Sequence, residues 1–185
     1  MYLKTLCATL TAFASLQTPT SYSLESDADA EITIQSDRAE LDRKSGTAVY
    51  SGNVVLEQGT LLINADQITL YSNQNQQLNK AVAKGKPAHF QQQMEGDKGL
   101  TKAQGHIITY LTLDKNISLL KEAVLEQEGN SFSGNQITYD IINESVSAKG
   151  QAGTQLDPTG EQPSSRIKMI IQPAKPAETK TNEDA

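Results

Sequence analysis

The chain has 185 residues, with 16 Lys or Arg against 22 Asp or Glu, and a formal net charge of −6. This length predicts one domain, and the acidic balance argues against a broad nucleic-acid footprint. One Cys and two His cannot build a four-ligand zinc site or a disulfide framework, so we expect no metal and no cofactor.

Residues 1–23 are typical of a cleaved signal peptide. Lys4 precedes an uncharged and modestly apolar stretch over residues 5–16. We expect cleavage after Ser21-Tyr22-Ser23, with Ala12-Phe13-Ala14 as an earlier alternative. Removal of the segment would also remove Cys7 and leave a cysteine-free exported chain, which fits the periplasm. The competing interpretation is a retained N-terminal segment that is disordered or buried.

From residue 31 onward, apolar and polar residues alternate with a period of two. The clearest runs are rich in Val, Ile, Thr and Tyr, and they occupy residues 32–35, 53–57, 67–71, 136–139 and 166–169. Turn signals that contain Gly, Asn or Asp separate such runs roughly every 8–12 residues. This pattern predicts an all-β sandwich, barrel or roll.

The chain also repeats itself. Val55-Leu56-Glu57-Gln58 recurs at residues 124–127, and Gln67-Ile68-Thr69 recurs at residues 136–138, both with an offset of 69. A shared offset indicates a unit of several strands used twice, neither copy of which buries its apolar face alone. Residues 94–103 are predicted to form the loop between the copies.

Towards the C-terminus the pattern changes. Residues 157–163 predict a loop, residues 167–171 predict a last strand, and residues 174–185 have no apolar pattern. We therefore expect a disordered polar tail over residues 174–185.

No catalytic constellation is found, and we expect no enzyme. His89 has the opposite parity to Phe90 and is expected to face solvent, while His106 is expected at the start of a strand. A Gly-x-Ser-x-Gly motif and a phosphate-binding glycine loop are both absent from the sequence.

The positions of the apolar residues are more informative about function. Alternate residues of a strand point to the same face, and this spacing places the apolar residues on one face of the strands. That face comprises Ile32, Ile34, Leu41, Tyr50, Val54, Leu56, Leu61, Ile63, Ile68, Leu70, Phe90, Ile108, Tyr110, Leu125, Phe132, Ile137 and Tyr139. Val82 is assigned to the same face, and the opposite parity of Leu111 and Leu113 predicts a bulge or register change near them. The face is either a packed core or the lining of an open roll that accepts alkyl chains.

Several motifs in order resemble the OstA-like family over about residues 30–173. They are Ile-Thr-Ile-Gln-Ser-Asp at 32–37, Tyr-Ser-Gly-Asn-Val at 50–54, Gln-Gly-Thr at 58–60, Ile-Asn-Ala-Asp at 63–66, Gly-Lys-Pro-Ala at 85–88 and Asn-Gln-Ile-Thr-Tyr at 135–139. The resemblance implies an open, slightly twisted antiparallel β-jellyroll over residues 24–173. It also implies a periplasmic bridge protein that carries lipopolysaccharide from the inner to the outer membrane, with acyl chains in the apolar interior.

The resemblance further implies partners and docking edges. The partners are lipopolysaccharide, an LptC-like jellyroll of the inner-membrane export complex, the N-terminal jellyroll of an LptD-like outer-membrane translocon, and further copies of the chain joined head to tail. Sheet edges available for pairing are expected at Ile32, Thr33, Ile34, Gln35 and Ser36 and at Arg166, Ile167, Lys168, Met169, Ile170 and Ile171. The alternative is a structural adaptor that links envelope complexes through these edges without a lipid ligand.

Overall fold

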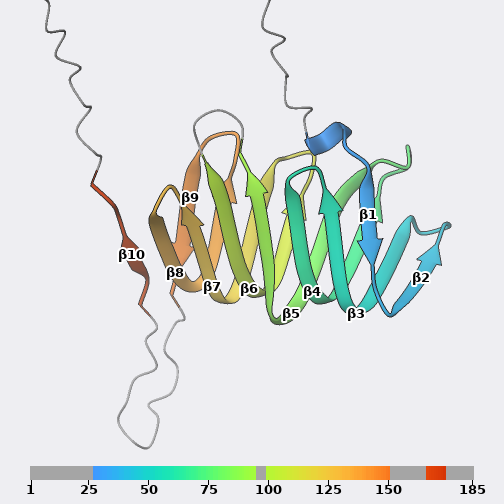
Figure 1. Ribbon diagram of the computed structural model, residues 1–185, viewed down its shortest axis with the longest axis horizontal. Helices are drawn as coiled ribbons and strands as arrows, with labels where there is room; N and C mark the ends of the chain where they lie inside the picture. The colour runs from blue at the N-terminus through green and yellow to red at the C-terminus, as the bar shows by residue number, and fades with distance from the viewer. Residues whose placement is uncertain (1–26, 95–98, 151–165, 174–185) are drawn as a thin grey trace, which may run out of the picture.

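The computed structural model describes residues 27–94, 99–150 and 166–173 as one antiparallel sheet (Figure 1). After a short 3-10 helix, η1 (Asp27–Asp29), come β1 (Ile32–Gln35), β2 (Arg38–Asp42), β3 (Thr47–Gln58), β4 (Leu61–Ser72), β5 (Leu78–Gln93), β6 (Leu100–Leu111), β7 (Asn116–Gln127), β8 (Asn130–Asp140), β9 (Ser145–Lys149) and β10 (Lys168–Ile170). The expected signal peptide, the loop at 157–163 and the tail at 174–185 lie outside the described residues. No helix in the described part has the length and hydropathy of a membrane span.

The expected all-β class is confirmed, and the order of the strands makes the sheet a continuous ribbon. The hydrogen-bonded path runs β1-β3-β4-β5-β6-β7-β8-β10, with β2 paired to β3 and β9 paired to β8. The strands follow one another along the long axis, from β1 and β2 at one end to β8, β9 and β10 at the other (Figure 1). Nearly every strand therefore lies beside its neighbour in sequence.

Both ends of the sheet consist of half-strands. β1 pairs with residues 55–58 of β3, and β2 pairs with residues 47–51 of the same strand. At the other end, β10 and β9 share β8 in the same manner. The sequence predicted one edge strand at each end; the structure adds β2 and β9, and it leaves Ser36, Arg166, Ile167 and Ile171 outside the strands.

The long strands are interrupted near their middles, and these interruptions bend the sheet. Register shifts occur between Ser51 and Val54 in β3, and between Leu120 and Ala123 in β7. Similar shifts interrupt β4, β5 and β6. Extra residues of this kind kink a strand, so a row of them across successive strands folds the whole sheet. We call the two resulting halves the β1 wall, which ends in β1 and β10, and the β2 wall, which ends in β2 and β9.

Two contacts prove that the walls face each other. The Gln127 side-chain nitrogen donates a hydrogen bond of 3.1 Å to the hydroxyl oxygen of Tyr139. Gln127 is paired with Asn130, nine residues before Tyr139 on β8, which is about 30 Å along a straight strand. The rings of Phe90 and Tyr110 also meet edge to face, with centroids 5.8 Å apart, although Phe90 is paired with residue 103 of β6.

The bent sheet buries one face in its interior. Ile68, Ile117, Leu125 and Ile137 are each 0% exposed, and they belong to a single cluster of buried apolar residues from β3 to β8. Because the cluster lies between two halves of one sheet, the walls cannot separate without exposing it. Burial of large aliphatic side chains here stabilises the fold by about 1.5–3 kcal/mol each.

The internal repeat is confirmed as a repeat of strands. With the offset of 69, Thr47–Gln58 (β3) corresponds to Asn116–Gln127 (β7), and β4 corresponds to β8. The predicted loop at 94–103 was too long, because β6 already begins at Leu100. The predicted bulge near Leu111 and Leu113 was wrong: β6 ends at Leu111, and Leu113 lies in the turn before β7.

We expect Leu125→Ala to lower the free energy of unfolding by about 2–5 kcal/mol, because it leaves a cavity between the two walls. Leu113→Ala removes the same atoms from a side chain that is 61% exposed, and it should change stability by less than about 0.5 kcal/mol. Urea unfolding followed by circular dichroism measures both variants. Equal losses would contradict the assignment of Leu125 to the interior.

Candidate functional site

The interior of the roll holds nearly all the residues that the sequence assigned to one apolar face. Twelve of them are buried: Val54, Leu56, Leu61, Ile63, Ile68, Leu70, Phe90, Ile108, Tyr110, Leu125, Ile137 and Tyr139. Ile34, Tyr50 and Phe132 are partly buried and pack against this cluster. Ile32 and Leu41, on the half-strands at the first end, remain 37% and 64% exposed. The interior is thus closed in its middle and open at that end.

Val82 was assigned to the wrong face. Its neighbours Ala81 and Ala83 are 3% and 1% exposed, whereas Val82 is only half-buried. The register of β5 shifts between Lys84 and Ala88, so inward positions are odd-numbered before the bend and even-numbered after it. Parity counted back from Phe90 therefore fails across the bend.

Several inward residues were not predicted from the sequence. They are Ala81, Ala83, Met94, Thr101 and Ala103, all of which are buried. Ala and Thr carry little hydropathy signal, and Met94 and Thr101 fell within a predicted loop. Met94 is tied to the strands, because its backbone N–H donates to the carbonyl of Gly99 at 3.0 Å.

A cavity of about 1030 Å³ occupies the first end of the interior. Its apolar lining comes from β1, β2, β3, β4 and β5 and consists of Ile32, Ile34, Leu41, Ala48, Tyr50, Leu70 and Leu78. Because β1 and β2 are short half-strands, they leave the side chains of the β3–β4 hairpin uncovered at this end. Leu70 lines the cavity and also belongs to the buried cluster, so the apolar surface of the cavity continues into the interior.

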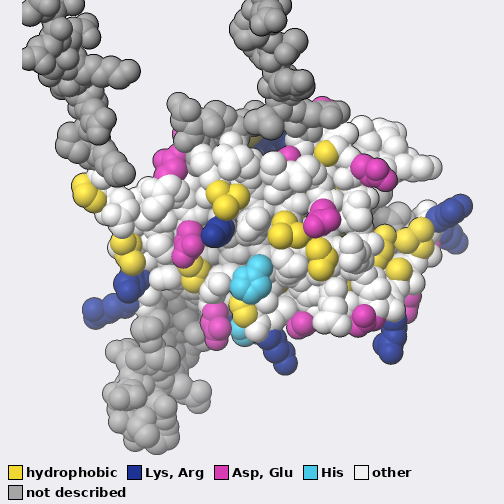
Figure 2. All heavy atoms as spheres, viewed as in Figure 1, with side chains coloured by type: hydrophobic (Ala, Val, Ile, Leu, Met, Phe, Trp, Pro, Cys, Tyr) yellow, Lys and Arg dark blue, Asp and Glu magenta, His cyan; other side chains and the backbone are white. Residues whose placement is uncertain are grey.

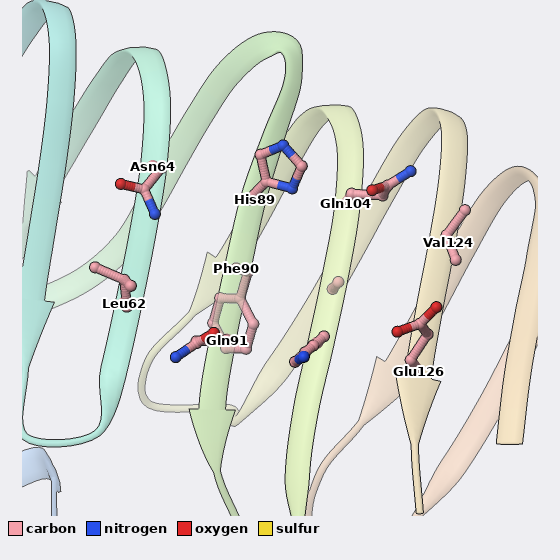
Figure 3. Close-up of a pocket in the computed structure, with 10 residues that line it drawn as sticks. Leu62, Asn64, His89, Phe90, Gln91, Gln104, Val124 and Glu126 are labelled. Carbon is pink, nitrogen blue, oxygen red and sulfur yellow. The ribbon is translucent and has the colours of Figure 1, made fainter. Parts of the chain in front are cut away.

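The outer face of the β1 wall carries a smaller hollow of about 160 Å³, lined by both polar and apolar side chains (Figure 3). Asn64, His89, Gln104 and Glu126 stand on this face, while the ring of Phe90 lies on the other side of β5. The expectation that His89 faces solvent is confirmed.

His106 lies in the middle of β6 rather than at a strand start, because that strand begins at Leu100. Its Nε2 atom is 3.3 Å from the Glu122 carboxylate, and the pair joins the bends of β6 and β7. Among the described residues, no group of three or more His, Cys, Asp or Glu is placed to hold a metal ion.

Asp27 of η1 ties the chain ahead of β1 to the roll. Its carboxylate accepts hydrogen bonds from the Thr60 backbone N–H at 2.7 Å, the Thr60 hydroxyl at 2.6 Å and the Gln92 amide at 2.7 Å. Partial burial by itself raises the pKa of Asp27, but these hydrogen bonds outweigh it, and the pKa lies below the usual value. Asp27 therefore connects η1 to the β3–β4 turn and to the end of β5.

A single bent sheet with an apolar interior, an open cavity at one end and half-strands at both edges defines an open β-jellyroll. Comparison with known proteins gives its family. A family model described as LptA/(LptD N-terminal domain) LPS transport protein matches residues 33–145. The chain belongs to this family, and the resemblance to OstA-like proteins, LptA among them, is confirmed.

Individual relatives match over most of their length. The lipopolysaccharide export system protein LptH of Pseudomonas aeruginosa is 38% identical over 165 residues, which cover 89% of this chain and 92% of the relative. LptA of Escherichia coli K12 is 28% identical over 139 residues, 74% of each chain. The crystal structure of LptH, described as the periplasmic LptA homologue of the lipopolysaccharide transport device, superposes with a TM-score of 0.67 at 37% identity and covers 80% of this chain and 100% of that one.

The Asp27 contact predicts a pH dependence. Because the pKa is lowered in the folded state, the ionised carboxylate stabilises the fold above the unfolded-state pKa, and this contribution is lost as pH falls through the folded-state pKa. Asp27→Asn should therefore be less stable than the wild type at pH 7, and the difference should shrink below about pH 4. Urea unfolding across this pH range measures the difference.

Asp29→Asn, on the exposed residue at the end of η1, is the matched control and should stay within about 0.5 kcal/mol of the wild type. A difference between Asp27→Asn and the wild type that does not change with pH would rule out the ionised carboxylate as its cause.

Proposed function

We propose that this chain is a periplasmic lipid-binding bridge protein that carries lipopolysaccharide from the inner to the outer membrane. Acyl chains occupy the interior of the jellyroll, which spans residues 24–173 after removal of the signal peptide at 1–23. The observation that carries the proposal is the apolar interior that opens into a cavity of about 1030 Å³ at the β1–β2 end. Membership of the LPS transport family supports the same ligand.

The chemistry of the interior favours an alkyl chain. Its lining is mostly aliphatic, and transfer of each CH₂ group from water into such a lining contributes about 0.8 kcal/mol. Beyond the cavity, the interior is filled by the protein's own side chains, with the Phe90–Tyr110 and Gln127–Tyr139 contacts closing the walls. A chain that advances past the cavity must part these walls, and its own methylene groups replace the contacts that are lost. The proposed role is non-enzymatic.

The edges support a bridge built from several jellyrolls. β1 and β2 end the sheet on one side and β9 and β10 on the other, so backbone N–H and C=O groups are available at both ends of the described sheet. Pairing of one jellyroll's last half-strands with the next one's first would extend the sheet and its interior. Such contacts do not close on themselves, and they admit further copies, an LptC-like partner and an LptD-like partner.

One observation favours the alternative of an adaptor without a lipid ligand. Away from the first end, inward residues such as Ile68 and Ile137 are 0% exposed, as in an ordinary core. The two functions differ in one respect: only the lipid-binding bridge needs an apolar surface at Ile34, which lines the cavity while remaining partly exposed.

We expect Ile34→Glu to impair lipopolysaccharide binding at neutral pH while the β fold persists. A carboxylate among acyl chains must lose its hydration or take up a proton, and both are unfavourable. In the lipid-free protein the same carboxylate reaches water in the cavity. Binding of labelled lipopolysaccharide, with circular dichroism for the fold, tests this variant.

Thr33→Glu adds the same charge to an exposed residue of β1 and should bind like the wild type. Equal binding by folded Ile34→Glu and wild type would contradict the placement of acyl chains beside Ile34. A folded wild type that binds no lipopolysaccharide would leave the adaptor.

The last strand, β10, is expected to be needed for assembly. Deletion of residues 166–185 removes β10 from its pairing with β8, and we expect it to abolish concentration-dependent oligomers while most of the β signal remains. Deletion of residues 174–185 alone keeps β10 and should leave the oligomers intact. Light scattering over a concentration series distinguishes the two. Equal oligomerisation by both truncated chains would exclude β10 as the docking edge.

A further inference from the structure

Two basic side chains line the open end of the cavity. Arg43 and Lys44 lie in the turn between β2 and β3, and both contribute to the lining of the cavity of about 1030 Å³ together with Ile34, Leu41 and Tyr50. Figure 2 shows basic side chains at this end of the molecule, over β2 and next to exposed hydrophobic ones. Cationic groups and an apolar surface therefore share one opening.

The turn that carries these side chains is held by its own residues. The Asp42 carboxylate accepts hydrogen bonds from the backbone N–H groups of Lys44 at 2.9 Å and Ser45 at 3.3 Å. The Gly46 carbonyl, in a residue with φ of 65°, accepts the backbone N–H of Ser72 at 2.8 Å and ties the turn to the end of β4. The backbone below Arg43 and Lys44 is thus fixed without the help of their side chains.

Among the described residues, Arg43 and Lys44 have no charged partner. The carboxylate next to them, Asp42, is occupied by backbone N–H groups of the turn. The described charged residues that line the cavity are Asp42, Arg43 and Lys44, which sum to +1 in a chain of net charge −6. A local excess of positive charge at an apolar opening is complementary to an amphiphile whose anionic group lies next to its chains.

We propose that Arg43 and Lys44 form an anion subsite at the mouth of the cavity, which binds a phosphate group of a phosphorylated glycolipid while its acyl chains enter between β1, β2 and β3. The inference rests on the proposed function and adds the recognition of the headgroup. A guanidinium offers paired N–H donors that match phosphate oxygens, and an ammonium group adds a mobile point charge.

The subsite gives the interior a polarity. The described pocket at the β7–β8 turn, of about 420 Å³, shares Lys102 and Glu126 with the hollow on the outer face of the β1 wall, and its described charged residues sum to −1. It therefore offers neither an apolar interior nor a positive charge to the same ligand. The proposed subsite holds the headgroup at the β1–β2 end, while the chains point along the interior.

The test compares two ligands on three forms of the full chain. The ligands are fluorescent lipopolysaccharide and the same preparation after phosphatase treatment, which removes phosphate and keeps the acyl chains. The proteins are the wild type, Arg43→Gln/Lys44→Gln, and the control Lys84→Gln/Lys86→Gln, which loses the same charge at exposed positions of β5 that do not line the cavity. Circular dichroism verifies the fold of each variant, and each titration is repeated at two salt concentrations.

We expect the Arg43→Gln/Lys44→Gln variant to bind the phosphorylated ligand about tenfold more weakly than the wild type, and with a smaller dependence on salt. It should bind the dephosphorylated ligand as the wild type does, and the control variant should match the wild type with both ligands. Inorganic phosphate at matched ionic strength should not displace the bound lipid, because the chains hold it in the cavity.

Several outcomes would overturn the subsite. They are an equal loss with both ligands, no loss with either, or a change in self-association of the double variant in place of a change in lipid affinity. In each of these cases, wild-type binding of the dephosphorylated ligand would still uphold the proposed function. A wild type that binds neither ligand would contradict the function and the subsite together.

Discussion

In the part of the chain that the structure describes, a single antiparallel sheet with one apolar face has no second layer, so it must bury that face against itself. The bends in the middle of the long strands satisfy this constraint. In β3 and β7 the bend is made by residue pairs with positive φ, Gly52 and Asn53 in one copy and Lys121 and Glu122 in the other. The repeat therefore preserves the backbone conformation of the bend although the residue types differ. Everything inside the roll depends on these bends, because they bring the two walls into contact.

Folding a sheet on itself leaves its ends open, and the function follows from that opening. A barrel closes by pairing its first and last strands, whereas here each end is finished by two half-strands that belong to different walls. The half-strands cover the interior incompletely, which accounts for the cavity at the first end and for the exposure of Ile32 and Leu41. The same feature leaves the outer edges of these half-strands without a partner strand in the described sheet, and there we propose that a neighbouring jellyroll docks. The proposed lipid access and the proposed assembly thus share one structural cause.

Much of this was predictable from the sequence, because the relevant signals are local. Alternation with a period of two predicted the strands, the offset of 69 predicted the equivalence of β3 with β7, and the order of short motifs predicted the family. The inward face was also predicted well, since most inward residues are large and aliphatic.

The wrong and missing predictions have two causes, which are the bends in the strands and the contacts between residues far apart in the sequence. Val82 was misassigned because the bulge in β5 shifts parity, and no hydropathy pattern marks a bulge of that kind. The hydrogen bond from Gln92 to Asp27 spans 65 residues. The sequence around Asp27 does not show whether its carboxylate makes such a long-range contact or only caps a local turn. The cavity end was likewise unpredictable, because it depends on where two half-strands stop.

The central claim is that acyl chains occupy the space between the two walls. Methyl NMR of isoleucine-labelled protein titrated with lipopolysaccharide tests it without altering the chain. We predict nuclear Overhauser contacts from acyl methylene protons to the methyl groups of inward residues, beginning at Ile34 and extending to Ile63 and Ile68, with none to Ile107 or Ile142 on the outer face and in a turn. Bound lipopolysaccharide that contacts the outer methyl groups and leaves the inward ones unchanged would contradict the account.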